Sequence, residues 1–253
     1  MKDQLILTKL IPRPVRFGSA LAGLLLLGIA ASSSSAQVLP PSSLPYGYSY
    51  QEWSAKWWQF YYGQSTDNMR PLGFSGICEG PASRVLFLNG APATTTETNH
   101  VTILAGTPLF FAILAFAADN TSCPTNTFTT NSADVLADEA VAGWNGAATL
   151  TTCTIDGVAV PGLDNPTTTI YNVVSPPFSY TTAEKDNIVA VAEGEPCLPG
   201  GLTIYPAVAD GVYLMLSPLS PGKHTIHSVG VAGPLSSPFL KLDITYDITV
   251  LPF

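Results

Sequence analysis

The residues best suited to contact a ligand lie between Trp53 and Tyr62, where six aromatic side chains occur close together. Aromatic faces stack on sugar rings and on other planar or apolar groups. Four of these residues recur at the spacing of one helix face: Trp53, Trp57, Phe60 and Tyr61. That spacing favours a core helix packed against a sheet. Trp58 and Tyr62 fall off this face, so they are our candidate ligand-binding residues.

Glu52 directly precedes the aromatic segment and has two interpretations. Ser49 and Glu52 have the spacing of a helix capping box. In an apolar setting the pKa of a carboxyl rises, and Glu52 could then act as a catalytic acid. Glycoside hydrolysis would need a second, facing carboxyl, and the sequence does not identify one. We therefore favour the capping role and assign no catalytic residue.

Histidines and other acidic residues give no metal-site pattern. His224 and His227 lie three residues apart in an expected strand, so they point to opposite faces, and His100 is distant in sequence. The acidic groups Asp119-Asn120 and Asp134/Asp138/Glu139 lack the spacing of a calcium loop with a glycine turn. No nucleophile elbow, zinc helix, phosphate loop or dinucleotide motif occurs. We expect neither a metal ion nor another cofactor.

The chain contains four cysteines: Cys78, Cys123, Cys153 and Cys197. An even number in an exported protein indicates two disulfides, although four cysteines allow three different pairings. We predict the pairs Cys123–Cys153 and Cys78–Cys197. The first would fix a short helical insertion to a strand, and the second would join two loops rich in glycine and proline.

Apolar patterns predict two helices and about eight to ten strands. The first helix begins after Ser49 and ends at Gly63, and the second spans 133–144 with Ser132 as its cap. We expect strands at 84–88, 101–104, 109–116, 149–155, 158–160, 168–174, 188–192, 212–216, 223–229 and 240–251. Asp156-Gly157 indicates a hairpin, Asp210-Gly211 should introduce a strand, and residues 240–251 alternate as in a half-buried antiparallel strand. The fold class is all-β: an antiparallel, jelly-roll-like β-sandwich with one N-terminal aromatic helix and a short helical insertion.

Residues 1–36 have the three parts of a secretory signal peptide. Lys2, Lys9, Arg13 and Arg16 form a basic start, an apolar run follows at 20–30, and small residues lead to Ala36. We expect cleavage between Ala36 and Gln37, a secreted or periplasmic protein, and a single domain at 37–253. An uncleaved membrane anchor is the alternative, but the apolar run is about half the roughly 20 residues that span a bilayer. We expect no membrane span in the mature chain.

Charge narrows the range of partners. The leader holds four of the ten Lys and Arg residues and one of the 18 acidic residues, so residues 37–253 carry a net charge of −11. A surface of that sign repels phosphate backbones. We therefore expect no nucleic-acid partner.

Three segments resemble a family of uncharacterised exported bacterial proteins that has no assigned activity. They are the EWSAKWW segment at 52–58, AGTPLFF at 105–111, and DGVYL at 210–214 followed by PGKHTIH at 221–227. The resemblance spans most of residues 47–251 and implies a bacterial, exported protein. Similar chains carry a cysteine just before the strand that starts at Val101, where this chain has His100. The resemblance therefore leaves open that one cysteine is unpaired.

These observations favour a non-enzymatic exported protein with a structural or interaction role. Its partner would be a carbohydrate or another exported protein. The alternatives are an extracytoplasmic hydrolase of a surface polymer and a carbohydrate-binding module. An enzyme should have a cleft with converging acids or histidines, and a sugar-binding module should have exposed, coplanar aromatic rings.

Overall fold

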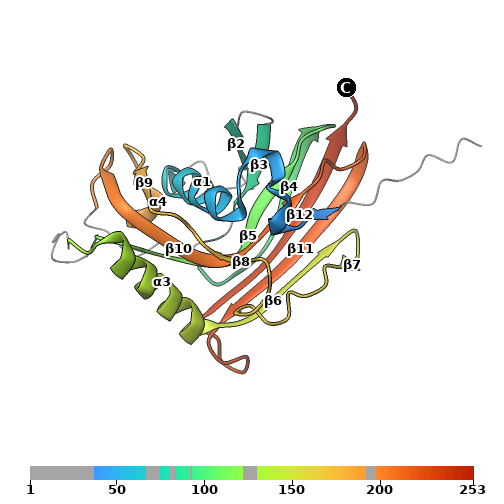
Figure 1. Cartoon of the computed structure of the whole chain (residues 1–253). Coiled ribbons are helices and arrows are strands. Elements are labelled where there is room, and N and C mark those ends of the chain that lie inside the picture. The colour runs from blue at the N-terminus through green and yellow to red at the C-terminus, as the bar shows by residue number, and fades with distance from the viewer. Residues whose placement is uncertain are drawn as a thin grey trace, which may run out of the picture. The chain divides into compact units, whose positions relative to one another are not determined.

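The computed structural model describes residues 37–66, 75–79, 84–89, 91, 93–121, 130–191 and 198–253, with only the backbone described at 75–79 and Arg84. The described part is mostly β-structure in two sheets (Figure 1). The first sheet contains β1 (Val38–Leu39), β2 (Ser75–Glu79), β3 (Arg84–Leu88), β5 (Leu109–Asp119), β8 (Asn172–Val174), β9 (Phe178–Thr181) and β10 (Thr203–Leu216). The second contains β4 (Thr95–Leu104), β6 (Ala148–Ile155), β7 (Val158–Ala159), β11 (Gly222–Ala232) and β12 (Leu240–Leu251).

Helix α1 (Tyr50–Tyr62) follows two short 3-10 turns, Pro41–Ser43 and Pro45–Gly47. Its capping box is present as predicted. The Ser49 side chain accepts a hydrogen bond from the Glu52 N–H, and the Glu52 carboxylate accepts one from the Ser49 N–H at 2.8 Å. Gly63 caps the other end. The helix lies in the bend of β10, against β5, β8 and β9 (Figure 1).

The antiparallel pair β5–β10 is the centre of the first sheet. The expectation that Asp210-Gly211 introduces a strand is wrong, because both residues lie inside β10, opposite Phe116 and Ala115 of β5. A Cβ on Gly211 would lie 2.4 Å from that of Ala115, so close strand packing requires glycine here. Asp-Gly is a frequent turn pair, and the sequence does not distinguish a turn from this close contact.

In the second sheet, β12 pairs antiparallel with β11 and parallel with β4. The alternation predicted for 240–251 is confirmed: Leu242, Ile244, Tyr246, Ile248 and Val250 are buried, and the polar residues between them are half-buried. The β3–β5 pair is also parallel. The expectation of purely antiparallel strands is therefore wrong for two pairs, because alternation reports which face is buried and not the direction of a neighbour.

The segment expected as a strand at 188–192 differs in the structure. Residues 188–191, expected as a strand, form the short helix α4 (Ile188–Val191), and the Asn187 side chain accepts a hydrogen bond from the Ala190 N–H at 2.8 Å, as a helix cap does. The strand expected at 168–174 is reduced to β8. The Asp156-Gly157 hairpin is confirmed, and both residues have positive φ, 51° and 78°.

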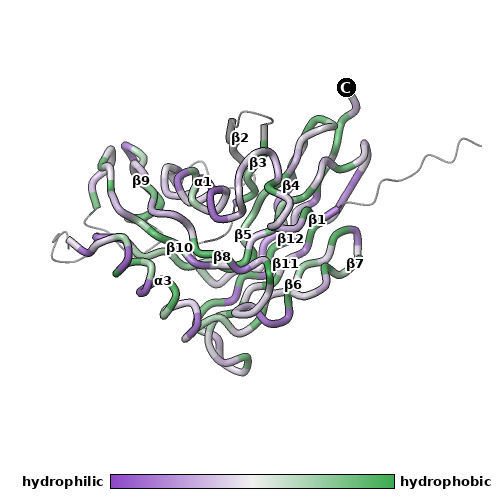
Figure 2. The backbone as a smooth tube through the Cα atoms, in the orientation of Figure 1, coloured by the Kyte–Doolittle hydropathy of each residue, from purple (hydrophilic) through white to green (hydrophobic). Residues whose placement is uncertain are grey.

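Helix α3 (Ala133–Ala147) covers β10 and β5 on the side away from α1 (Figure 1). Ser132 caps it as predicted, and the helix extends slightly beyond the expected end. Leu136, Ala140 and Trp144 form its buried stripe. Figure 2 shows polar and apolar segments alternating along α3, as expected for a helix with one face on a sheet. Within the described residues, no helix is long and apolar enough to cross a membrane.

Candidate binding pocket

Trp53 and Trp57 belong to the core, as their spacing predicted. Their exposed fractions are 0% and 3%. The indole nitrogen of Trp53 donates to the carbonyl of Pro45 at 2.8 Å, and that of Trp57 donates to the carbonyl of Leu88 at 2.9 Å. Because both indole N–H groups have partners and both rings are covered, these two residues fix α1 against the first sheet.

Trp58 and Tyr62, the candidate ligand-binding residues, also lie inside the protein. Their exposed fractions are 5% and 7%, and their ring centroids are 4.7 Å apart with planes tilted by 50°. The Trp58 indole nitrogen donates to the hydroxyl of Tyr213 on β10 at 2.8 Å, and burial raises the pKa of that hydroxyl. The two rings therefore do not form a flat, solvent-facing platform. They form part of the wall of a pocket.

The pocket lies where β3 separates from β5. The register between these strands ends with Phe87 opposite Phe110. The next carbonyl of β3, that of Leu88, accepts a hydrogen bond from Trp57 instead. Beyond Phe110, no described strand pairs with this edge of β5. A cavity of about 160 Å³ follows the edge.

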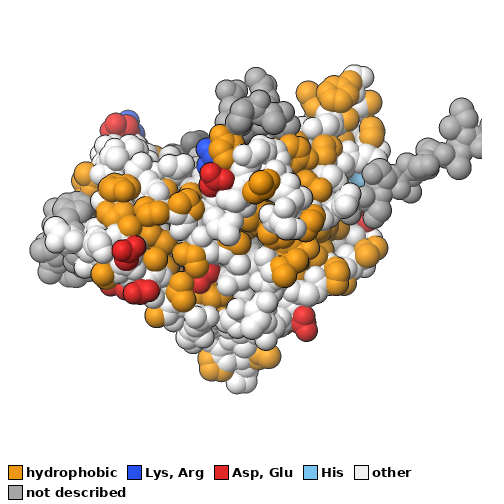
Figure 3. Space-filling model, in the orientation of Figure 1, with side chains coloured by type: hydrophobic (Ala, Val, Ile, Leu, Met, Phe, Trp, Pro, Cys, Tyr) orange, Lys and Arg blue, Asp and Glu red, His pale blue; other side chains and the backbone are white. Residues whose placement is uncertain are grey.

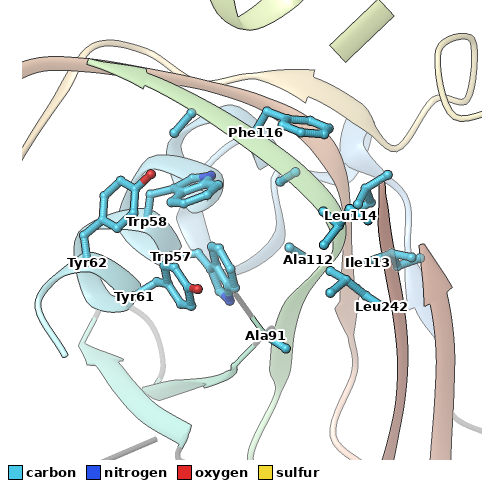
Figure 4. A pocket seen from close by; sticks show the side chains of 13 residues that line it. Trp57, Trp58, Tyr61, Tyr62, Ala91, Ala112, Ile113, Leu114, Phe116 and Leu242 are labelled. Atoms are coloured by element: carbon cyan, nitrogen blue, oxygen red, sulfur yellow. The ribbon is translucent and has the colours of Figure 1, made fainter. Parts of the chain in front are cut away.

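We call this cavity the α1–β5 pocket. Figure 4 shows aromatic side chains of α1 on one side and residues of β5 with Leu242 of β12 on the other. The full lining is Trp57, Trp58, Tyr61, Tyr62, Ala91, Ala112, Ile113, Leu114, Ala115, Phe116, Ala117, Leu240 and Leu242. No Asp, Glu, His, Lys, Arg or Cys is among them. The polar side-chain groups of these residues are the hydroxyls of Tyr61 and Tyr62 and the indole N–H groups of Trp57 and Trp58, which donate to Leu88 and Tyr213. An apolar cavity of about this size stays dry and accepts benzene.

A second hollow, of about 250 Å³, continues along β5. Tyr62 and Ala117 line both hollows, and the second adds the carboxylates of Asp119 and Glu139. Asp119 accepts a hydrogen bond from the hydroxyl of Tyr180 at 2.6 Å, and Glu139 is an exposed side chain of α3. The groove is thus apolar along most of β5 and acidic at the end of the strand.

Glu52 lies outside both hollows and serves the helix cap. Its carboxylate accepts hydrogen bonds from the backbone and the hydroxyl of Ser49 at 2.8 and 2.9 Å. These bonds favour the ionised form and lower the pKa of Glu52. A general acid at neutral pH needs a raised pKa, so this geometry suits a cap.

The three histidines pair with three separate carboxylates, at 2.7, 2.8 and 3.5 Å: His224–Asp156, His227–Asp243 and His100–Asp247. His224 and His227 take different partners because they point to opposite faces, as predicted. The hydrogen bond from His227 lowers the pKa of Asp243. Among the described residues, no group of three or more His, Cys, Asp or Glu side chains is placed to hold a metal ion.

The loop around Asp119-Asn120 is closed by an amide. Asn120 donates to the backbone carbonyl of Asn131 at 3.0 Å and accepts from its N–H at 2.9 Å. Asp134, Asp138 and Glu139 lie on α3, all exposed. Calcium-binding loops place their carboxylates around the ion by a turn of the backbone, and these three carboxylates lie on a helix instead.

Cys153 has a free, buried thiol on β6. Burial raises the pKa of this thiol to about 12. Its expected partner Cys123 lies outside the described residues, as does Cys197, and no side chain is described for Cys78. The two pairings therefore stay predictions.

Asp210 is a buried carboxyl that sequence reasoning missed. It is 2% exposed, and the Asn172 amide donates to it at 2.6 Å. Burial raises the pKa of Asp210 to about 6. In the sequence, Asp210 only precedes the apolar run that starts at Val212, and this pattern does not mark it as a buried position inside a strand.

Comparisons with known proteins add only distant similarities. No family model matches the chain, and no curated protein matches it. Two solved structures align. The first, the complex of PbICP-C with falcipain-2, is 14% identical over 67% of this chain and 98% of that chain, with a TM-score of 0.23. The second, the solution structure of amebosin, is 9% identical over 62% of this chain and 98% of that chain, with a TM-score of 0.19.

The pocket combines predicted and unpredicted residues. Trp58 and Tyr62 were singled out because they fall off the main apolar face, and both are in the wall. Ala91, Leu240 and Leu242 were not singled out, because their contribution depends on how β5 and β12 approach α1. Small side chains such as Ala115 and Ala117 leave the space, and no sequence signal marks that role.

Proposed function

We propose that this chain is an exported, non-catalytic binding protein and that the α1–β5 pocket receives an apolar group of its partner. The observation that carries the proposal is an apolar cavity of about 160 Å³ beside a strand edge that has no described partner. Concave apolar pockets with a few polar groups are typical of binding sites.

The chemistry of the wall favours binding over catalysis. The pocket residues include neither an acid–base pair nor a nucleophile with a base within reach. Glu52, the one acid near the aromatic segment in sequence, is held ionised by the cap. A hydrolase of surface polymers would need two carboxylates that face one bond, and the described carboxylates near the pocket, Asp119 and Glu139, follow it along β5 instead.

A carbohydrate-binding module is the other alternative, and the burial of the aromatic rings weighs against it. Sugar stacking needs an accessible aromatic face, whereas Trp58 and Tyr62 are almost fully covered. Export and removal of residues 1–36 are part of the proposal, as is the jelly-roll-like arrangement of the two sheets. The signal-peptide pattern supports the first, and the two-sheet architecture is compatible with the second.

The binding of small aromatic molecules tests the pocket. Toluene and indole are added to residues 37–253, and the melting temperature and tryptophan fluorescence are recorded. A ligand of the native state raises the melting temperature as its concentration passes its Kd. We expect a rise with at least one of the two probes, and a change in fluorescence because Trp57 and Trp58 line the cavity.

Two alanine substitutions make the test specific. Ala117→Leu fills the pocket from β5, whereas Ala142→Leu adds the same bulk to an exposed position of α3. We expect the probe response to be lost in the first variant and kept in the second, with both folded by circular dichroism. Equal responses in both variants, or none in the unmodified chain, would overturn the proposal.

A further inference from the structure

Among the described residues, one edge of β5 is paired along its whole length, and no strand pairs with the other edge beyond Phe110. Its pairing with β10 runs from Leu109 to Asp119, whereas its pairing with β3 ends at Phe110. The residues from Ala115 to Asp119 are only half-buried although β10 covers their other edge. An open edge presents backbone N–H and C=O groups that can pair with another strand.

The α1–β5 pocket runs along this edge and not over one face of the sheet. Every residue from Ala112 to Ala117 contributes to its wall. Successive side chains of a strand point to opposite faces, so a cavity that touches all of them must lie beside the backbone. The aromatic rings of α1 bound it on one side, and Leu242 of β12 bounds it on the other. Leu240 is also part of the lining. A chain placed here could pair with β5 and insert side chains on both faces.

A buried amide follows β3 in the chain, two residues after the pairing of β3 with β5 ends. Asn89 directly follows β3, is 4% exposed, and neither its Nδ2 nor its Oδ1 has a hydrogen-bond partner. Its backbone carbonyl accepts a hydrogen bond from the hydroxyl of Tyr246, and Ala91, two residues later, is in the pocket wall. Buried polar groups rarely lack partners. The Asn89 side chain itself is not part of the pocket wall.

At the Asp119 end of the β5 edge, two carboxylates favour a partner with a positive charge. Asp119 and Glu139 line the second hollow, and neither has a basic partner among the described residues. On the face shown in Figure 3, Lys and Arg side chains are rare and acidic side chains are scattered over the surface. A cation next to these carboxylates would gain from their charge without displacing an existing ion pair.

We propose that the open edge of β5 binds an extended peptide by strand addition, with apolar side chains in the α1–β5 pocket and a Lys or Arg side chain beside Asp119 and Glu139. This inference rests on the proposed binding function and names the class of partner. The edge from Ala112 to Asp119 would pair with about eight residues, a length of roughly 24 Å at about 3.4 Å per residue. Main-chain hydrogen bonds would supply affinity, and the two hollows would select side chains.

Designed peptides test this directly. The probes are fluorescein-labelled peptides of about eight residues, a length set by the strand spacing, that alternate Val and Thr and carry a Lys at the N-terminal or the C-terminal end. Matched peptides replace the Lys with Glu or the central Val with Pro. We expect one of the two Lys peptides to bind, the Pro peptide to fail because proline removes a ladder donor, and the Glu peptide to bind more weakly.

Two neighbouring acids provide the matched variants. Glu139→Gln removes a carboxylate from the hollow, whereas Asp138→Asn removes an exposed carboxylate on α3 outside it. We expect the preference for Lys over Glu to fall by about twofold to fivefold in the first variant, as for an exposed ion pair, and to persist in the second. Hydrogen exchange of the amides from Ala112 to Asp119 should slow when the peptide binds, which a purely electrostatic contact would not cause.

The two sets of probes distinguish peptide binding by strand addition from the binding of small ligands in the pocket. If toluene or indole still binds and neither Lys peptide does, strand addition is wrong and the pocket proposal stands. If the small probes also fail, both proposals are wrong. If Ala117→Leu converts a dimer of the unmodified chain to a monomer in light scattering, the edge belongs to a second copy of the chain and the peptide proposal is overturned. Binding of the Pro peptide with equal affinity would also overturn it.

Discussion

Trp53 connects α1 to the entry segment and to the first sheet. Its ring contacts Tyr48 edge-on at 5.2 Å and Phe87 at 6.1 Å, and its nitrogen is bonded to Pro45. Removing this fully buried ring leaves a cavity that the surrounding rings cannot close. We expect Trp53→Ala to lower the free energy of unfolding by about 3–5 kcal/mol, measured by denaturant titration.

The control for this change is Ile170→Ala, because Ile170 is 66% exposed. Its loss should stay within about 0.5 kcal/mol, as for most surface substitutions. A loss below about 1 kcal/mol for Trp53→Ala would contradict the burial of the helix face, since emptying a core site costs more.

Asp210 makes stability depend on pH. Burial raises its pKa from 3.8 in the unfolded chain to about 6 in the folded protein. The folded state therefore binds the proton more tightly, and this contribution is complete below 3.8 and is lost as the pH rises through about 6. The shift corresponds to at most about 3 kcal/mol.

Asp210→Asn keeps the shape and removes the titration. We expect the variant to lose part of the decrease in unfolding free energy between acidic and neutral pH that the unmodified chain shows, as followed by urea titration across that range. Asp164→Asn, at an exposed position, should leave the pH dependence unchanged. Identical pH profiles for Asp210→Asn and the unmodified chain would show that Asp210 keeps an ordinary pKa.

At the scale of elements, the sequence predicts those with local signals. Ser49 and Glu52 mark the start of α1, Ser132 marks the start of α3, and Asp156-Gly157 marks a hairpin, because each signal depends on neighbouring residues. The strand expected at 188–192 fails for the opposite reason. Four or five apolar residues suit a strand or a short helix equally, and the cap that favours the helix, Asn187, lies outside the apolar run.

The reactivity of Cys153 on β6 tests the disulfide predictions. The thiol is buried, and its pKa of about 12 leaves almost no reactive thiolate at neutral pH. We expect N-ethylmaleimide to leave Cys153 unlabelled in the folded protein, because the residue is buried. After unfolding without reductant, a free Cys153 thiol takes the label, whereas the predicted disulfide keeps it unlabelled. The measurement is peptide mapping by mass spectrometry.

The same map decides the pairing. A Cys123–Cys153 peptide, with no label on Cys153 after unfolding, would support the bridge predicted from the sequence and contradict the free thiol. A Cys78–Cys197 peptide would support the second pair. Rapid labelling of Cys153 in the folded protein would instead show that β6 is less protected than its 2% exposure indicates.

At the scale of the whole described unit, the pocket depends on contacts that are distant in sequence. Trp58 on α1 meets Tyr213 on β10, which lies 155 residues further along the chain, and Leu242 closes the far side from β12. Periodicity assigns a residue to a face of its own element. It does not state which strand ends early, so the separation of β3 from β5 and the open edge could not be predicted.

The start of the mature chain is a further prediction at this scale, and the first sheet gives it a physical reason. The Gln37 carbonyl accepts a hydrogen bond from the Ser217 N–H at 2.9 Å. Val38 and Leu39 then pair with the end of β10, and the Tyr50 hydroxyl donates to the Leu39 carbonyl at 2.6 Å. Cleavage after Ala36 would leave all of these bonds intact, whereas cleavage a few residues later would remove an edge strand.

We therefore expect the protein recovered from the exported fraction to have the intact mass of residues 37–253. Ala36→Arg, which places a large charged side chain at the expected cleavage position, should lower the amount of that species, because a signal peptidase needs small residues there. The control is Ser217→Arg, because Ser217 lies far from the segment that a signal peptidase recognises. This variant should keep the cleavage position unchanged even if it destabilises β1. Recovery of a species that keeps residues 20–30 would show that the leader is retained as an anchor.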